Sequence, residues 1–102
     1  MNTINPKAFV TAVPIASRLR HIIYRALVKR GIVTVTDLCT KSEDDIGRLP
    51  GFKSGNTEVI KAGLAQVGLH LGMSETELSE YRRRFLREYW REAKRKQKRN
   101  MI

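Results

Sequence analysis

The chain has 102 residues, with 20 Lys or Arg against 10 Asp or Glu, so its formal net charge is +10. This length allows one small domain and an extension. A protein this basic usually meets nucleic acid, an acidic membrane surface or an acidic protein.

The only cysteine, Cys39, excludes an internal disulfide, and we expect it to be a small buried apolar side chain. No stretch has the apolar length of a membrane span, and the N-terminus has neither the basic start nor the apolar run of a signal peptide. We therefore expect a cytoplasmic protein, located in the nucleoid.

The first fifteen residues contain two prolines and no helical period, which predicts an arm or linker over 1–15. A helix is predicted over 19–30, with Ser17 as its N-cap and Gly31 as a left-handed C-cap. Its apolar residues recur at the spacing of one buried face, and its basic residues recur on another face. The apolar set is Leu19, Ile22, Ile23, Ala26 and Leu27, and the basic set is Arg18, His21, Arg25 and Lys29.

Two short helices are predicted next. Thr34 or Thr36 can cap the first, and Ser42 opens the second in a capping-box pattern with Asp45. Pro50 stops the second helix, because the residue before a proline avoids helical geometry.

A glycine-rich hairpin turn is predicted over 51–55, followed by a helix from about Asn56 to Val67 with Gly68 as its cap. The inward residues of this helix are expected to be Val59, Ile60, Leu64 and Val67. Glycines in the turn permit unusual backbone conformations, and backbone N–H groups that lead into a helix can bind phosphate.

A second capping box, Ser74 with Glu77, opens a helix that is expected to reach the mid-nineties. Residues 80–102 contain ten Lys or Arg against three Glu, so the basic excess is concentrated there. Aromatic residues at helical spacing favour packing on the domain or on a second copy over stacking on bases. They are Tyr81, Phe85, Tyr89 and Trp90.

The ordered series of segments over 16–73 resembles the C-terminal domain of the bacterial RNA polymerase alpha subunit. The segments that carry the resemblance are Gly31–Leu38 (GIVTVTDL), Ser42–Ile46 leading to Pro50, and Gly68–Met73 (GLHLGM). The resemblance implies a bundle of four short helices that contacts the DNA minor groove through the first helix and the hairpin. The family's contact positions fall on Ile22, Arg25, Ala26, Lys53, Ser54, Gly55 and Asn56.

The sequence therefore predicts an all-α protein, a compact bundle of short helices with a helix-hairpin-helix-like turn and a long basic C-terminal helix. We divide it into an arm (1–15), a helical domain that carries the resemblance (16–73) and a basic tail (74–102). We expect transcription-associated nucleic-acid binding, with DNA favoured over RNA, through phosphate and minor-groove contacts. The candidate binding residues are Arg18, Arg25, Lys29, Lys53, Ser54, Gly55, Asn56, Lys61, Arg83, Arg87, Arg91 and Lys94.

The main alternative is a protein-interaction module. In this interpretation the aromatic face of the last helix, with Tyr81, Phe85, Tyr89 and Trp90, binds RNA polymerase, a transcription factor or a second copy. A membrane-surface helix is the third and least favoured interpretation.

No cofactor, metal site or enzymatic activity is expected. His21 and His70 have no Cys, Asp or Glu partner at ligand spacing, and no nucleophile and base can be paired from the sequence.

Overall fold

Six helical elements follow one another in the part of the chain that the computed structural model describes, residues 3–100. The side chains of Ser54 and of residues 96–100 are not described. No β-strand occurs in this range, where an isolated bridge pairs Phe9 with Thr34, so the predicted all-α class is confirmed. The elements are η1 (Val10–Ala12, a 3-10 turn), α1 (Arg20–Lys29), α2 (Val35–Cys39), α3 (Glu43–Gly47), α4 (Ser54–Gln66) and α5 (Glu75–Asn100).

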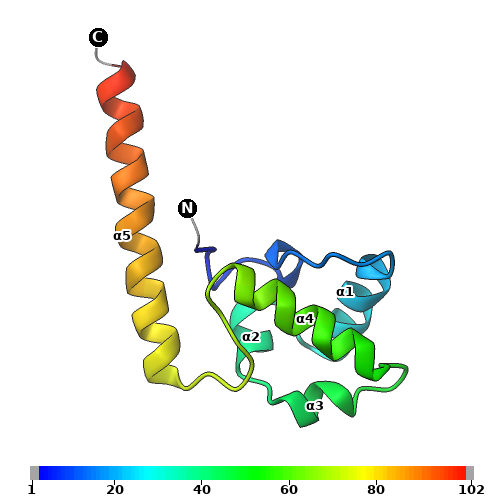
Figure 1. The fold of residues 1–102 in the computed structure, drawn as a ribbon. Helices are drawn as coiled ribbons and strands as arrows, with labels where there is room; N and C mark the ends of the chain where they lie inside the picture. Colours follow the sequence, from blue (N-terminus) through cyan, green and yellow to red (C-terminus); the bar gives the residue numbers. More distant parts are fainter. Residues whose placement is uncertain (1–2, 101–102) are drawn as a thin grey trace.

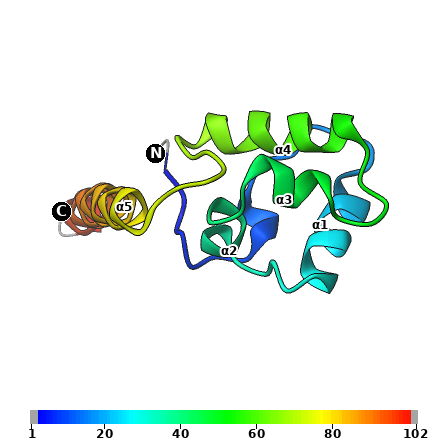
Figure 2. The same cartoon turned by 90° about the horizontal axis from the view of Figure 1, so that it is seen from below.

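The helices divide into a packed body and one projecting helix. We call residues 3–73 the body; in it, η1 and α1 to α4 surround a common hydrophobic core (Figure 1). Helix α5 extends away from the body as one long rod. In the perpendicular view, α5 lies beside the body, and α1 lies at the opposite end (Figure 2).

Capping side chains start the two short helices. At α2, Thr34 Oγ1 accepts a hydrogen bond from Asp37 N at 3.1 Å, and the Asp37 carboxylate accepts one from Thr34 N at 3.0 Å. At α3, Ser42 and Asp45 exchange the equivalent two bonds. Both predicted helix starts are confirmed, with Thr34 as the cap of α2.

The prediction that residues 1–15 form an arm or linker is wrong for the described part of that segment. Val10 and Val13 are fully buried, and Ile15 is nearly so. Backbone hydrogen bonds attach the segment to the start of α2, with Val10 N donating to Val33 O at 2.7 Å. The segment is buried because it supplies apolar side chains that a core this small needs.

Helix α1 buries a narrower face than its apolar spacing predicts. Ile23 and Leu27 are fully buried, but Leu19 precedes the helix and is exposed, and Ile22 is 63% exposed. Neighbouring residues in a helix point about 100° apart, so a helix at the edge of a small body cannot bury both Ile22 and Ile23. The left-handed conformation predicted for Gly31 is confirmed, with φ of 81°.

Helix α4 begins at Ser54, earlier than predicted, so Gly55 belongs to its first turn and not to the hairpin. The chain reverses at Gly51, whose φ is 83°, and Phe52 N donates to Leu49 O at 3.0 Å. The inward positions are confirmed for Ile60, Leu64 and Val67, which are buried, while Val59 is half-buried.

Candidate nucleic-acid interface

Helix α5 is attached to the body at its N-terminal end. The predicted capping box is present: Glu77 N donates to Ser74 Oγ, and Ser74 N donates to Glu77 Oε1, both at 3.2 Å. The Tyr81 side chain is buried in the core, and Thr3 Oγ1 donates to Glu88 Oε2 at 2.6 Å. Among the described residues, no hydrogen bond or ion pair joins α5 to the body beyond Glu88. Among the described residues, α5 therefore has no polar contact with the body after Glu88, and the helix projects away from the body (Figure 1).

Four cationic side chains form what we call the basic stripe of α5. Their spacing of four, four and three residues places them on one face of the helix. All four are exposed, and within the described part of the chain none of them forms an ion pair. The ion pair that α5 does form among its own described residues joins Arg95 to Glu92 at 3.3 Å. The stripe consists of Arg83, Arg87, Arg91 and Lys94.

The predicted aromatic interface divides into a buried and an exposed part. Tyr81 is 5% exposed and packs in the core, so it belongs to the body contact and not to an open surface. Phe85 is half-buried, whereas Tyr89 is 50% and Trp90 60% exposed. The Trp90 ring meets the Tyr89 ring edge to face, with centroids 5.5 Å apart and an interplanar angle of 82°.

The exposed aromatic residues adjoin the basic stripe in an open groove of about 440 Å³. The groove is lined by Leu86, Arg87, Trp90, Arg91 and Lys94. Three of these five residues belong to the basic stripe, and the groove has no acidic lining residue.

The remaining predicted binding residues lie at the far end of the body. Figures 1 and 2 both place α1 and the start of α4 at the end away from α5. Arg18, which lies just before α1, and Arg25 and Lys29, which lie within it, are all exposed. The structure therefore separates this second basic surface from the basic stripe.

The start of α4 forms the rest of this second surface. Lys53 is the N-cap of α4, and its side chain accepts no capping hydrogen bond from the backbone N–H groups of the first turn. Lys53 and Gly55 are exposed, and Asn56 is half-buried. The side chain of Ser54 lies outside the described residues.

Lys61 differs from the other predicted binding residues because its charge is paired. Its Nζ lies 2.5 Å from a Glu43 carboxylate oxygen and 3.6 Å from one of Glu58. The hydrogen bond and charge of Glu43, with the charge of Glu58, raise the Lys61 pKa above its ordinary value. A phosphate would have to compete with two carboxylates, so we place Lys61 outside the interface.

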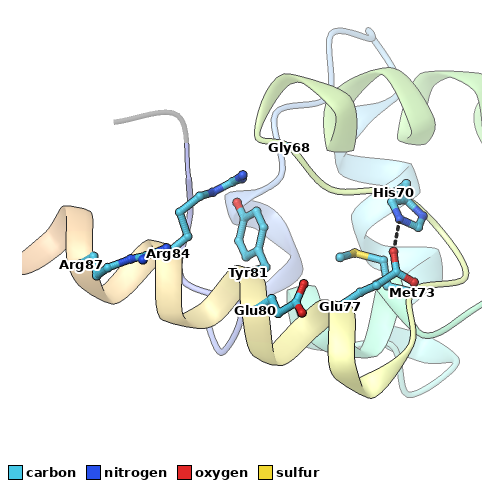
Figure 3. A pocket seen from close by; sticks show the side chains of 8 residues that line it. All are labelled: Gly68, His70, Met73, Glu77, Glu80, Tyr81, Arg84 and Arg87. Atoms are coloured by element: carbon cyan, nitrogen blue, oxygen red, sulfur yellow. Dashed lines mark hydrogen bonds and ion pairs between the residues drawn. The ribbon is translucent and has the colours of Figure 1, made fainter.

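A groove of about 360 Å³ separates the loop after α4 from the first turns of α5 (Figure 3). His70 and Glu77 meet there, with Nε2 and Oε2 2.8 Å apart, while His70 Nδ1 lies 2.8 Å from Leu71 O. These partners raise the pKa of His70, the Leu71 carbonyl most and Glu77 next. The sequence prediction missed this pair, because a loop residue and a helix residue seven positions apart give no periodic signal. Glu77, Glu80, Arg84 and Arg87 all line this groove from α5, so negative and positive charges there are balanced.

The described residues offer little support for other kinds of site. They contain no group of three His, Cys, Asp or Glu side chains that could bind a metal ion. Cys39 is buried as predicted, and desolvation raises the pKa of its thiol to about 12. No helix in the described range is both long and apolar enough to cross a membrane.

The geometry thus provides two separated basic surfaces, and among the described residues the basic stripe places four exposed cations without an ion pair on one face of a single helix. Comparison of the sequence with protein-family models and with curated proteins found no match.

Proposed function

We propose that this protein binds nucleic acid, DNA in preference to RNA, and that the basic stripe of α5 makes the main phosphate contacts. The observation that carries the proposal is the position of Arg83, Arg87, Arg91 and Lys94, all exposed on one face of the projecting helix. At 1.5 Å per residue the stripe is roughly 16 Å long, the axial rise of about five nucleotides of one DNA strand. Each phosphate that the stripe neutralises releases counterions and adds sequence-independent affinity.

The second basic surface adds a contact of a different kind. Its likeness to the C-terminal domain of the polymerase alpha subunit supports a transcription-associated role and a contact in the DNA minor groove. Arg18 lies just before α1, and α1 contributes Arg25 and Lys29. Lys53 lies just before α4, whose first turn contributes Gly55 and Asn56. Narrow, AT-rich minor grooves attract basic side chains, so this surface would favour AT-rich DNA.

The experiment that tests the proposal measures binding to a labelled AT-rich duplex across a salt series. The test variant replaces the basic stripe with glutamine (R83Q, R87Q, R91Q and K94Q). The matched control removes the same charge from four exposed body residues that are not among the predicted binding residues (K7Q, R20Q, K41Q and R48Q). We expect the salt slope to fall by about three to four in the test variant and much less in the control. Equal losses in both variants would mean that net charge alone drives binding.

A double variant tests the body surface. Arg25→Glu with Lys53→Glu should reduce the preference for AT-rich over GC-rich duplex, because both side chains lie on the surface assigned to the minor groove. The salt slope contributed by the stripe should remain. An unchanged sequence preference would remove the body surface from the proposal and leave the stripe.

The exposure of Tyr89 and Trp90 favours a second candidate function, the binding of a protein. RNA polymerase, a transcription factor or a second copy of this chain could cover these side chains. Trp90→Ala would then abolish the protein contact and leave binding to duplex DNA unchanged.

A further inference from the structure

The groove on α5 combines one exposed aromatic ring with three cations. Arg87, Arg91 and Lys94 line it together with Leu86 and Trp90, and no carboxylate lines it. An apolar partner helix on Trp90 would remove water from these three cations. No carboxylate in the groove could compensate their charge, so this desolvation would cost free energy. A polyanion supplies that counter-charge. Charge complementarity therefore selects a polyanionic occupant for the groove.

The Trp90 ring is exposed, and its orientation is restricted by a neighbouring ring. It is 60% exposed, and the edge-to-face contact with Tyr89 restricts its orientation from one side. Tyr89 is in turn 6.1 Å from Phe85, which is half-buried at the base of the projecting part of the helix. This aromatic series connects the Trp90 ring to the packed part of the molecule.

We infer that this groove binds a single-stranded stretch of nucleic acid, with a base stacked on Trp90 and the neighbouring phosphates on Arg87, Arg91 and Lys94. A duplex keeps its bases stacked on one another, so it offers the indole face no base, whereas an unpaired base has a free face. Because every base has such a face, the site would bind single strands with little sequence preference. The inference rests on the proposed function. It adds that the part of the basic stripe beside Trp90 binds an unpaired strand.

Trp90 is the only tryptophan in the chain, so its fluorescence reports directly on the groove. The probe is an oligothymidylate of about ten nucleotides, compared with an abasic chain of the same length and with a duplex. We expect the oligothymidylate to quench Trp90 strongly. The abasic chain and the duplex contact only the cations beside the ring, so they should change its emission much less.

Affinity measured through a labelled oligothymidylate provides the second readout. Trp90→Leu should weaken binding by about tenfold, in the range of one lost base stack, while Trp90→Phe should retain most of it. Phe9→Leu is the matched control, because Phe9 is the most exposed aromatic residue of the body at 71%. It should bind as the unsubstituted protein does.

The outcomes separate the inference from the function on which it rests. Equal quenching by the abasic chain, or tight binding with no quenching, would overturn base stacking and leave phosphate binding in place. Failure to bind any nucleic acid near physiological salt would overturn the proposed function as well. A dimer in sedimentation, with Trp90 emission that changes with protein concentration alone, would assign the groove to a second copy and overturn the inference.

Discussion

The Tyr81 hydroxyl donates a 2.5 Å hydrogen bond to the backbone carbonyl of Val67 and accepts one from the Ile4 backbone N–H at 3.0 Å. One side chain of α5 thus connects the end of α4 with the N-terminal segment. Burial raises the pKa of Tyr81, so the hydroxyl remains protonated and able to donate at neutral pH. This buried polar atom is one of the contacts that attach the projecting helix to the body, together with the Thr3–Glu88 hydrogen bond.

Tyr81→Phe removes the hydroxyl and leaves both backbone groups without this partner. A buried polar group that loses its hydrogen bond costs about 1–3 kcal/mol, so we expect a loss of unfolding free energy in that range. Urea denaturation measures it. Tyr89→Phe is the control, because Tyr89 is half exposed, and surface changes usually remain within about 0.5 kcal/mol. Equal stability of Tyr81→Phe and the unsubstituted protein would show that the Tyr81 hydroxyl does not contribute to the attachment.

Gly63 is required by a close approach between α4 and the N-terminal segment. A Cβ at this position would lie 2.1 Å from the Pro14 carbonyl oxygen, a backbone atom that cannot move alone. Alanine normally stabilises a helix relative to glycine, but here we expect Gly63→Ala to destabilise the protein by about 1–3 kcal/mol. Gly55→Ala in the first turn of α4 meets nothing within 4 Å and is the matched control. Thermal unfolding should show opposite signs for the two variants.

The His70–Glu77 pair makes stability depend on pH in a defined direction. The pKa of His70 is raised from 6.5, so its contribution is fully present below about pH 6.5 and is lost as pH rises through the raised value. The pKa of Glu77 is lowered from 4.5, mainly by the Ser74 backbone bond and then by His70. Its contribution is present above about pH 4.5 and is lost as pH falls through the lowered value. The pair should therefore stabilise the start of α5 most between these limits.

Urea midpoints at about pH 6 and about pH 8 test this dependence. We expect His70→Gln to remove part of the decrease in stability that the unsubstituted protein shows between these two values. His21→Gln is the control, since His21 is exposed and makes no hydrogen bond within the described residues. A His70→Gln variant with an unchanged pH slope would contradict the role of the pair.

The features that could be predicted from the sequence are those that lie within four or five residues of one another. The capping boxes at Ser42 and Ser74 each close over three residues, so the residue types alone locate these two helix starts. For α2 the sequence left Thr34 and Thr36 as alternatives, and the structure has Thr34 as the cap. The basic stripe could be predicted for the same reason, because helical periodicity places its members on one face.

The features that could not be predicted depend on contacts between distant parts of the chain. Val10 and Val13 have no periodic signal, and their burial follows from backbone pairing with the residues before α2. The pairing of Lys61 with Glu43 requires α3 and α4 to be adjacent, which local pattern does not reveal. The same limit applies to the aromatic residues of α5: their spacing predicted a common stripe, but only tertiary packing separates buried Tyr81 from exposed Trp90.

Cys39 provides a probe of how α2 and the start of α5 open. Its carbonyl accepts a 2.9 Å hydrogen bond from Met73 N, and its buried thiol has a pKa raised to about 12. With its pKa raised so far above pH 8, very little of the thiol is ionised at that pH, so alkylation should be slow until the structure opens. We expect Tyr81→Phe to accelerate labelling more than Gly55→Ala or Tyr89→Phe does, because it weakens the attachment beside Met73.

Fast labelling of the unsubstituted protein, at the rate of an unfolded peptide, would contradict the burial of Cys39. Mass spectrometry of the alkylated chain follows the rate directly, since there is one cysteine to modify.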